Sequence, residues 1–97
     1  MKNIFRYFLE AQDRLKNYSP KSRVFTSAEE IVYISDILHL EEIEDTEKMR
    51  ELRNMIVTYY YYLIHSLAYE DPLYKRYWNA MMSVTTVIDY MSHGKTA

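Results

Sequence analysis

Residues 46–92 read TEKMRELRNMIVTYYYYLIHSLAYEDPLYKRYWNAMMSVTTVIDYMS, and this stretch decides the fold. In residues 46–70 apolar side chains recur every three or four positions, which places them on one face of a long helix. Asp71 followed by Pro72 indicates the start of another helix, because aspartate caps free amides and proline suits the first helical position. The sequence therefore predicts two long helices, 46–70 and 72–92, that pack as an antiparallel hairpin with almost no loop between them.

The buried face of each long helix can be listed from this spacing. The first comprises Met49, Leu52, Ile56, Tyr59, Leu63, Ile64 and Leu67, and the second comprises Leu73, Tyr77, Met81, Val84, Ile88 and Met91. Gly94, the single glycine, stands where a left-handed cap would end the second helix near Ser92.

The N-terminal part predicts two shorter helices. In residues 2–17 the same spacing groups Ile4, Phe5, Phe8, Leu9 and Leu15 into one apolar stripe. Residues 18–27, YSPKSRVFTS, form a loop, because Pro20 cannot continue a helix. Ser27 and Glu30 match a capping box, so another helix should run from Ala28 to about residue 40.

Together these elements predict an all-α, four-helix bundle-like single domain over residues 1–97. Two helices of roughly 14 residues are too short to cover the apolar faces of two helices longer than 20 residues. We therefore expect a homo-oligomer, with a dimer favoured, in which a second copy covers the remainder.

Composition excludes several function classes. The chain has no cysteine and one glycine, so it offers neither thiolate chemistry nor a glycine-rich loop that could wrap a phosphate. Its longest uncharged run, residues 54–69, is too short and too rich in tyrosine for a membrane span. Only Asp36 and His39 have metal-ligand spacing, and no nucleophile turn is present. We expect no enzyme activity, no cofactor, no metal, no membrane insertion and a cytoplasmic location.

Tyrosine is unusually abundant, with 11 of 97 residues and four in succession at residues 59–62. Four successive helical residues point in every direction, so some of these rings must face another helix, a partner or water. The predicted partner-binding surface consists of Tyr61, Tyr62, Tyr69, Tyr74 and Trp78. The alternative is that these tyrosines only widen the core and place their hydroxyl groups in solvent.

Charge is unevenly distributed along the chain. The net charge is +4 over residues 1–25, −8 over residues 26–47 and +2 over the remainder. Glu41, Glu42, Glu44 and Asp45 form an acidic segment that is a second candidate contact surface, or simply a solvated face. The acidic second helix and the pI near 5.9 argue against nucleic-acid binding.

A third candidate is the loop before the second helix. Tyr18, Lys21, Arg23, Thr26 and Ser27 bring cations and hydroxyl groups to a helix N-terminus, where a phosphate-bearing ligand such as a nucleotide could bind. The alternative is that these cations pair with Glu29 and Glu30 of the next turn or with another chain.

The sequence therefore predicts a small non-enzymatic regulator or inhibitor that binds another protein. In size and composition alone the chain is similar to compact helical proteins of phages and mobile elements that block a host protein, and to small bacterial immunity proteins. This likeness is an analogy that rests on no shared motif. The alternatives are a protein that binds or sequesters a nucleotide-like ligand and a structural subunit of a larger assembly.

Overall fold

The computed structural model describes residues 3–20 and 27–96, and all regular structure in that part of the chain is helical. The elements in order are α1 (Ile4–Asn17), α2 (Ala28–Leu38), a short 3₁₀ turn η1 (Leu40–Glu42), α3 (Thr46–His65) and α4 (Pro72–Thr96). The predicted all-α, bundle-like fold with two short and two long helices is confirmed.

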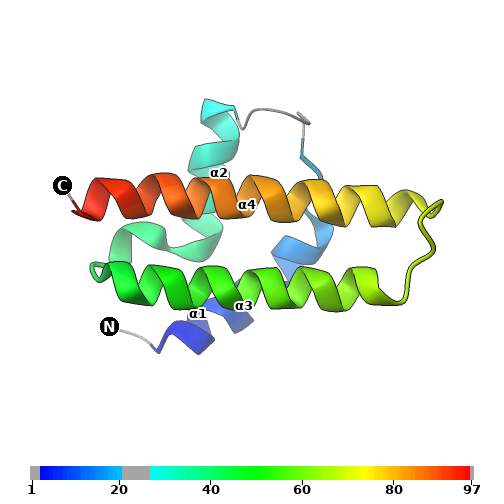
Figure 1. Cartoon of the computed structure of the whole chain (residues 1–97). Coiled ribbons are helices and arrows are strands. Elements are labelled where there is room, and N and C mark those ends of the chain that lie inside the picture. The colour runs from blue at the N-terminus through cyan, green and yellow to red at the C-terminus, as the bar shows by residue number, and fades with distance from the viewer. Residues whose placement is uncertain (1–2, 21–26, 97) are drawn as a thin grey trace.

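The two long helices form an antiparallel hairpin (Figure 1). Tyr61 contacts Trp78 near the closed end, and Arg53 pairs with Asp89 toward the open end, so the partners run in opposite directions along the chain. α1 and α2 lie behind this layer and pack against α3 and α4 respectively. The molecule measures 41 × 26 × 18 Å. Its long dimension matches α4, whose 25 residues span roughly 37 Å at the α-helical rise.

One hydrophobic core joins all four helices. Its most enclosed side chains include Leu15 from α1, Ile34 and Leu38 from α2, Leu52 and Ile56 from α3, and Val84 and Ile88 from α4. The spacing in residues 46–92 thus predicted most of the core that the hairpin contributes. Several details differ. Tyr60 takes the central position expected for Tyr59, and Leu73 is exposed. Ala80 and Val87 are buried although the spacing did not predict them.

Side-chain caps fix where the helices begin, and those of α2 and α3 were predicted from the sequence. The amide of Glu30 donates to the Ser27 hydroxyl oxygen over 3.2 Å, and the amide of Ser27 donates to the Glu30 carboxylate over 3.5 Å, so the predicted capping box is confirmed. Asp45 caps α3 by accepting the amide of Glu47 over 2.8 Å.

Two predicted helix ends are wrong. α3 ends at His65 and not at residue 70, and residues 66–71 link it to α4. Packed helices lie about 8–10 Å apart, and a single Asp-Pro junction cannot carry the chain across that gap. α4 continues past Ser92 to Thr96, with Gly94 inside the helix and no glycine at positive φ. One glycine costs a helix only about 1 kcal/mol, so it does not end α4.

The short helices also differ from prediction in detail. In α1 the buried face includes Tyr7 and Ala11, whereas Phe5 and Leu9 are about half exposed. The reason is that α1 packs against α2 as well as α3, which draws the Tyr7 side of the helix inward. α2 ends at Leu38, two residues early, because His39 adopts a left-handed conformation with φ of 52°. This turn brings Leu40 into the core.

The closed end of the hairpin projects past both short helices (Figure 1). Near this end, the Arg76 guanidinium group of α4 donates to the main-chain carbonyl of Asn17 at the end of α1 over 2.8 Å. No residue between Ile64 and Tyr77 is buried. The tip therefore depends mainly on contacts between α3 and α4.

Candidate protein-binding surface

An exposed group of aromatic rings surrounds the closed end of the hairpin. Tyr61 comes from the end of α3, Tyr69 from the link, and Tyr74 and Trp78 from the start of α4. We call these four residues the aromatic corner. Tyr69 is 79% exposed, Tyr61 50% and Trp78 39%, and Tyr74 is half-buried. The structure thus brings together four of the five aromatic residues predicted for partner binding.

The rings of the aromatic corner pack in two pairs. Tyr61 meets Trp78 edge to face, with ring centroids 6.0 Å apart and planes at 69°. Tyr69 and Tyr74 lie 5.3 Å apart at 57°. Such arrangements match the quadrupoles of aromatic rings. Each ring therefore supports another while keeping part of its surface open.

The link between the helices determines where these rings lie. Asp71 accepts the amide of Leu73 over 2.9 Å, which caps α4 and sets its first turn. Tyr74 follows on that turn, and Trp78 lies one turn later on the same side of α4. The predicted Asp-Pro signal therefore positions the α4 half of the aromatic corner.

A pocket of about 460 Å³ opens in the aromatic corner and is lined by Tyr69, Tyr74, Lys75, Trp78 and Asn79. Its wall is mainly aromatic, and Lys75 and Asn79 add side-chain hydrogen-bond donors. Sequence reasoning missed these two residues. The signal was present, because Lys75 and Asn79 share a face of α4 at a four-residue spacing.

Tyr62, the fifth predicted aromatic residue, faces elsewhere. It follows Tyr61 by about 100° around α3 and is 77% exposed. Tyr59 contacts Phe8 of α1, and Tyr60 is buried. The run of four tyrosines thus divides between core, aromatic corner and solvent.

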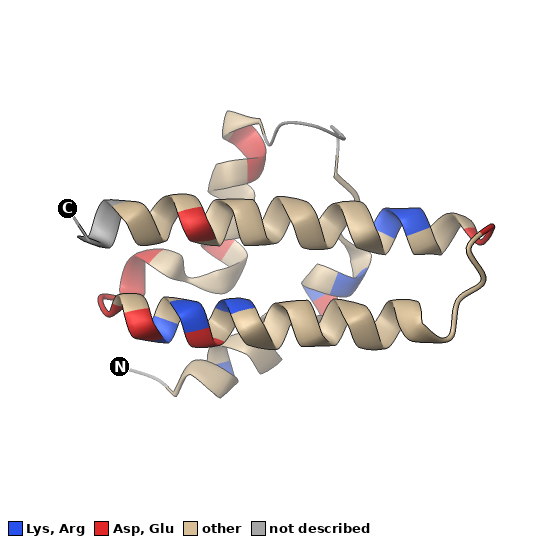
Figure 2. Ribbon diagram, viewed as in Figure 1, with Lys and Arg blue, Asp and Glu red and all other residues tan. Residues whose placement is uncertain are grey.

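The acidic segment lies near the other end of the hairpin. Figure 2 shows acidic residues along α2, η1 and the start of α3. Glu41, Glu42, Glu44 and Asp45 are all exposed, while Ile43 between them is fully buried. Ile43 anchors this segment to the core. Asp45 is the cap of α3, and Glu42 contacts His39 over 3.4 Å, so these two side chains also have structural contacts.

The predicted ligand loop is only partly described. Lys21, Arg23 and Thr26 lie outside the described residues. Tyr18 is buried, and its hydroxyl group donates to the Glu30 carboxylate. Burial and this hydrogen bond raise the pKa of Tyr18. Ser27 is engaged in the capping box.

A pocket of about 400 Å³ lies beside Tyr18, and its lining includes Glu29 and Glu30, whose carboxylates would repel a phosphate. Ligand binding by this loop stays a prediction.

Within residues 3–20 and 27–96, no three histidine, aspartate or glutamate side chains are grouped so as to hold a metal ion. Across the same residues, no helix combines the length and the apolar character that crossing a bilayer requires.

Comparison of the chain with protein-family models, with curated proteins and with solved structures gives no match in any of the three. The case for a function therefore depends on the geometry described above.

Proposed function

We propose that this protein binds another protein through the aromatic corner and acts as a stoichiometric regulator or inhibitor. The observation that carries the proposal is the set of exposed, mutually supporting rings around the pocket of Tyr69, Tyr74 and Trp78. Tyrosine and tryptophan are the residues most enriched among those that dominate binding energy at protein interfaces.

The setting of the aromatic corner favours a protein partner. Tyr61 and Trp78 are on adjacent helices and hold each other, so little side-chain freedom is lost when a partner covers them. Beyond the corner, residues 54–65 of α3 and 77–88 of α4 carry no charge (Figure 2). Met82 extends the exposed apolar surface one turn past Trp78. Exposed patches of this kind mark interaction sites.

The acidic segment is the second proposed contact surface. It begins near the first residue of α3, whereas the aromatic corner begins near the last, so the two are separated by roughly 30 Å along a 20-residue helix. A partner that engages both surfaces must lie along the whole hairpin. A small partner would use one of them.

The first partner to test is a second copy of the chain. α1 and α2 both lie behind the hairpin (Figure 1), and Tyr62 and Tyr90 of the long helices are exposed. Light scattering coupled to size exclusion should be run at two concentrations about tenfold apart, because dimerisation follows mass action. If a dimer forms and Trp78→Ala returns it to monomer, the aromatic corner serves self-association. If the chain is monomeric, the corner is open to a foreign partner.

The decisive experiment compares matched aromatic-to-alanine variants. Immobilised wild type, Tyr69→Ala, Trp78→Ala and Tyr90→Ala are incubated with extract of the source cells, and bound proteins are quantified. Tyr90 is the control, because it is exposed on α4 away from the pocket. We expect a stoichiometric partner whose affinity falls at least about tenfold with Trp78→Ala, as for a hot-spot residue. Tyr90→Ala should bind as wild type does.

The proposal fails if the corner variants, shown by circular dichroism to be folded, retain the partner as well as wild type does. It also fails if the chain is monomeric and no protein is retained in stoichiometric amount. Substituting Glu41 and Glu44 by glutamine tests the acidic segment in the same assay. Loss of binding in that variant alone would move the contact surface to the open end of the hairpin.

A further inference from the structure

A second groove lies at the open end of the hairpin, far from the aromatic corner. It has a volume of about 530 Å³ and lies between the first half of α3 and the last turns of α4, which form its two walls. Its polar walls include Arg50, Arg53 and Asn54 from α3 and Asp89, Ser92 and His93 from α4. This concentration of hydrogen-bond donors distinguishes the groove from the aromatic pocket.

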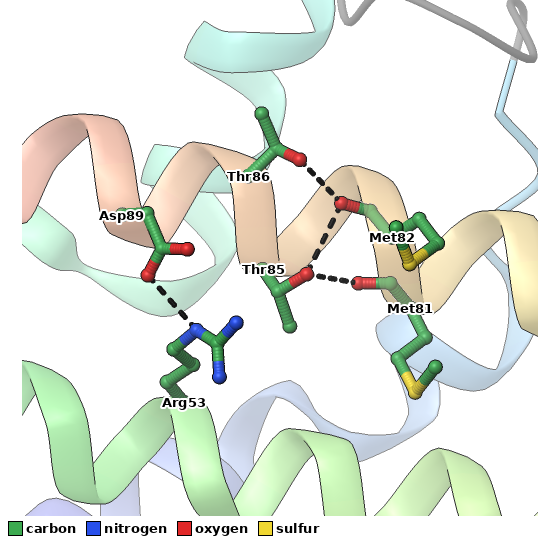
Figure 3. A network of polar contacts seen from close by, with 6 residues as sticks. All are labelled: Arg53, Met81, Met82, Thr85, Thr86 and Asp89. Atoms are coloured by element: carbon green, nitrogen blue, oxygen red, sulfur yellow. Dashed lines mark hydrogen bonds and ion pairs between the residues drawn. The ribbon is translucent and has the colours of Figure 1, made fainter.

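A single ion pair with Asp89 orients Arg53. Its Nε atom donates to Oδ1 of Asp89 over 2.9 Å, and the other two guanidinium nitrogens form no hydrogen bond to that carboxylate (Figure 3). Neither of these two nitrogens bonds to another residue in the described part of the chain. Asp89 thus orients the guanidinium group and leaves its terminal donors available.

Arg50 adds a second cation one turn earlier on α3. It is exposed and forms no ion pair with any residue that the structure describes. The neighbouring Lys48, in contrast, pairs with Glu51 over 3.6 Å. Two guanidinium groups therefore share the groove with one carboxylate, which Arg53 already uses. The groove has an excess of positive charge and of unused N–H donors.

We propose that this groove binds a tetrahedral oxyanion, either free phosphate or the phosphoryl group of a small phosphate monoester. Guanidinium groups bind such oxygens through paired N–H donors. The donors come from both walls, with Arg50, Arg53 and Asn54 opposite Ser92. A planar carboxylate has two oxygens, which can accept from donors on one wall. A tetrahedral anion has further oxygens, so it can accept from donors on both walls at once. The groove volume also leaves room for an attached organic group.

Nearby carboxylates limit the expected affinity. Glu47 is exposed and precedes Arg50 by one turn of α3, and Asp45 caps the same helix end. The groove is also open to water, which screens its charges. We therefore expect a dissociation constant on the order of 1 mM. Glu47→Gln should strengthen binding, because it removes a repelling charge without altering the groove wall.

The test is a titration of the ¹⁵N-labelled full chain with inorganic phosphate at pH 7.5, with ionic strength held constant by sodium chloride. We expect saturable amide shifts confined to the first turns of α3 and the last turns of α4. Arg50→Gln should weaken binding at least about fivefold, as for loss of a charge-assisted contact. Lys16→Gln, which removes an exposed cation of α1 outside the groove, should leave the affinity unchanged.

Two further ligands make the result specific. Phenyl phosphate that binds more tightly than phosphate identifies a small phosphate monoester as the ligand, and equal affinity identifies free phosphate. Acetate that binds as well as phosphate would overturn the tetrahedral assignment.

Absence of saturable shifts up to about 50 mM phosphate, well above the expected dissociation constant, would overturn the site itself. Binding that is unaffected by Arg50→Gln in a folded variant would do the same. None of these outcomes depends on the aromatic corner.

Discussion

The hydroxyl group of Tyr60 in α3 donates to the main-chain carbonyl of Leu15 in α1 over 2.9 Å, and both side chains are completely buried. Leu15 lies in the last turn of α1, where carbonyl groups lack the usual helical partner. The same carbonyl also accepts the amide of Tyr18 over 3.2 Å. One oxygen therefore both ends α1 and joins it to the hairpin.

Removing the Tyr60 hydroxyl group should destabilise the protein moderately. Tyr60→Phe loses one buried hydrogen bond, but the Leu15 carbonyl keeps the Tyr18 amide and is not left unpaired. We expect the free energy of unfolding to fall by about 0.5–1.5 kcal/mol, measured by urea titration. Tyr62→Phe is the matched control and should change it by less than about 0.5 kcal/mol, because Tyr62 is on the surface. Equal effects of the two variants would contradict the role of the hydrogen bond.

Stability should decline in alkaline solution. Burial raises the pKa of Tyr60 above its ordinary value, and burial with the Glu30 hydrogen bond does the same for Tyr18. Above a pH of about 10 the unfolded chain loses these protons while the folded chain keeps them. The unfolded state then binds fewer protons, so each group lowers the free energy of unfolding by up to about 1.4 kcal/mol per pH unit. Below that pH their contribution is fully present.

Urea titrations between pH 8 and pH 11.5 measure this decline. In Tyr60→Phe the slope above pH 10 should be shallower, because one of the groups with a raised pKa is gone. A variant slope as steep as that of wild type would show that Tyr60 does not contribute to it.

How far the sequence predicts this structure depends on the kind of signal. Spacing alone located Leu52, Ile56, Val84 and Ile88 in the core, because each long helix buries one continuous face. It failed for Phe5, whose burial depends on how α1 sits between two neighbours. Helix propensity belongs to single residues and does not determine how α1 is rotated against α2 and α3.

The candidate sites show the same division. Exposure of Tyr61 follows from four successive tyrosines on one helix, and Trp78 was recognised by its residue type. The groove of Arg50 and Asp89 was not predicted, because those residues are 39 positions apart and meet only when the hairpin closes. Which residues of α3 lie opposite which residues of α4 depends on how the two helices are aligned lengthwise, and the sequence pattern within one helix does not specify that alignment.

The capping box of α2 can be tested separately from the core. Ser27→Ala removes the acceptor of the Glu30 amide and should lower the free energy of unfolding by about 1 kcal/mol. Ser27→Asn keeps an acceptor at the cap and should stay close to wild type. Chemical denaturation of both variants checks this, and a similar loss in each would indicate that the serine contributes through another contact.

The ion pair of Arg53 and Asp89 should contribute little to stability. Its side chains are 37% and 50% exposed, so water screens the pair. A double-mutant cycle with Arg53→Gln and Asp89→Asn should give a coupling energy below about 1 kcal/mol. A coupling above about 2 kcal/mol would mean that the pair is a main connection between α3 and α4, which the open groove argues against.

The projecting tip of the hairpin has a consequence for dynamics. Since nothing between Ile64 and Tyr77 is buried, this segment can open while the rest of the core stays intact. Its amides should exchange with deuterium much sooner than those around Leu52 and Val84. A partner seated on Trp78 would close this local opening, so slowed exchange at the tip would report binding even before the partner's own structure is known.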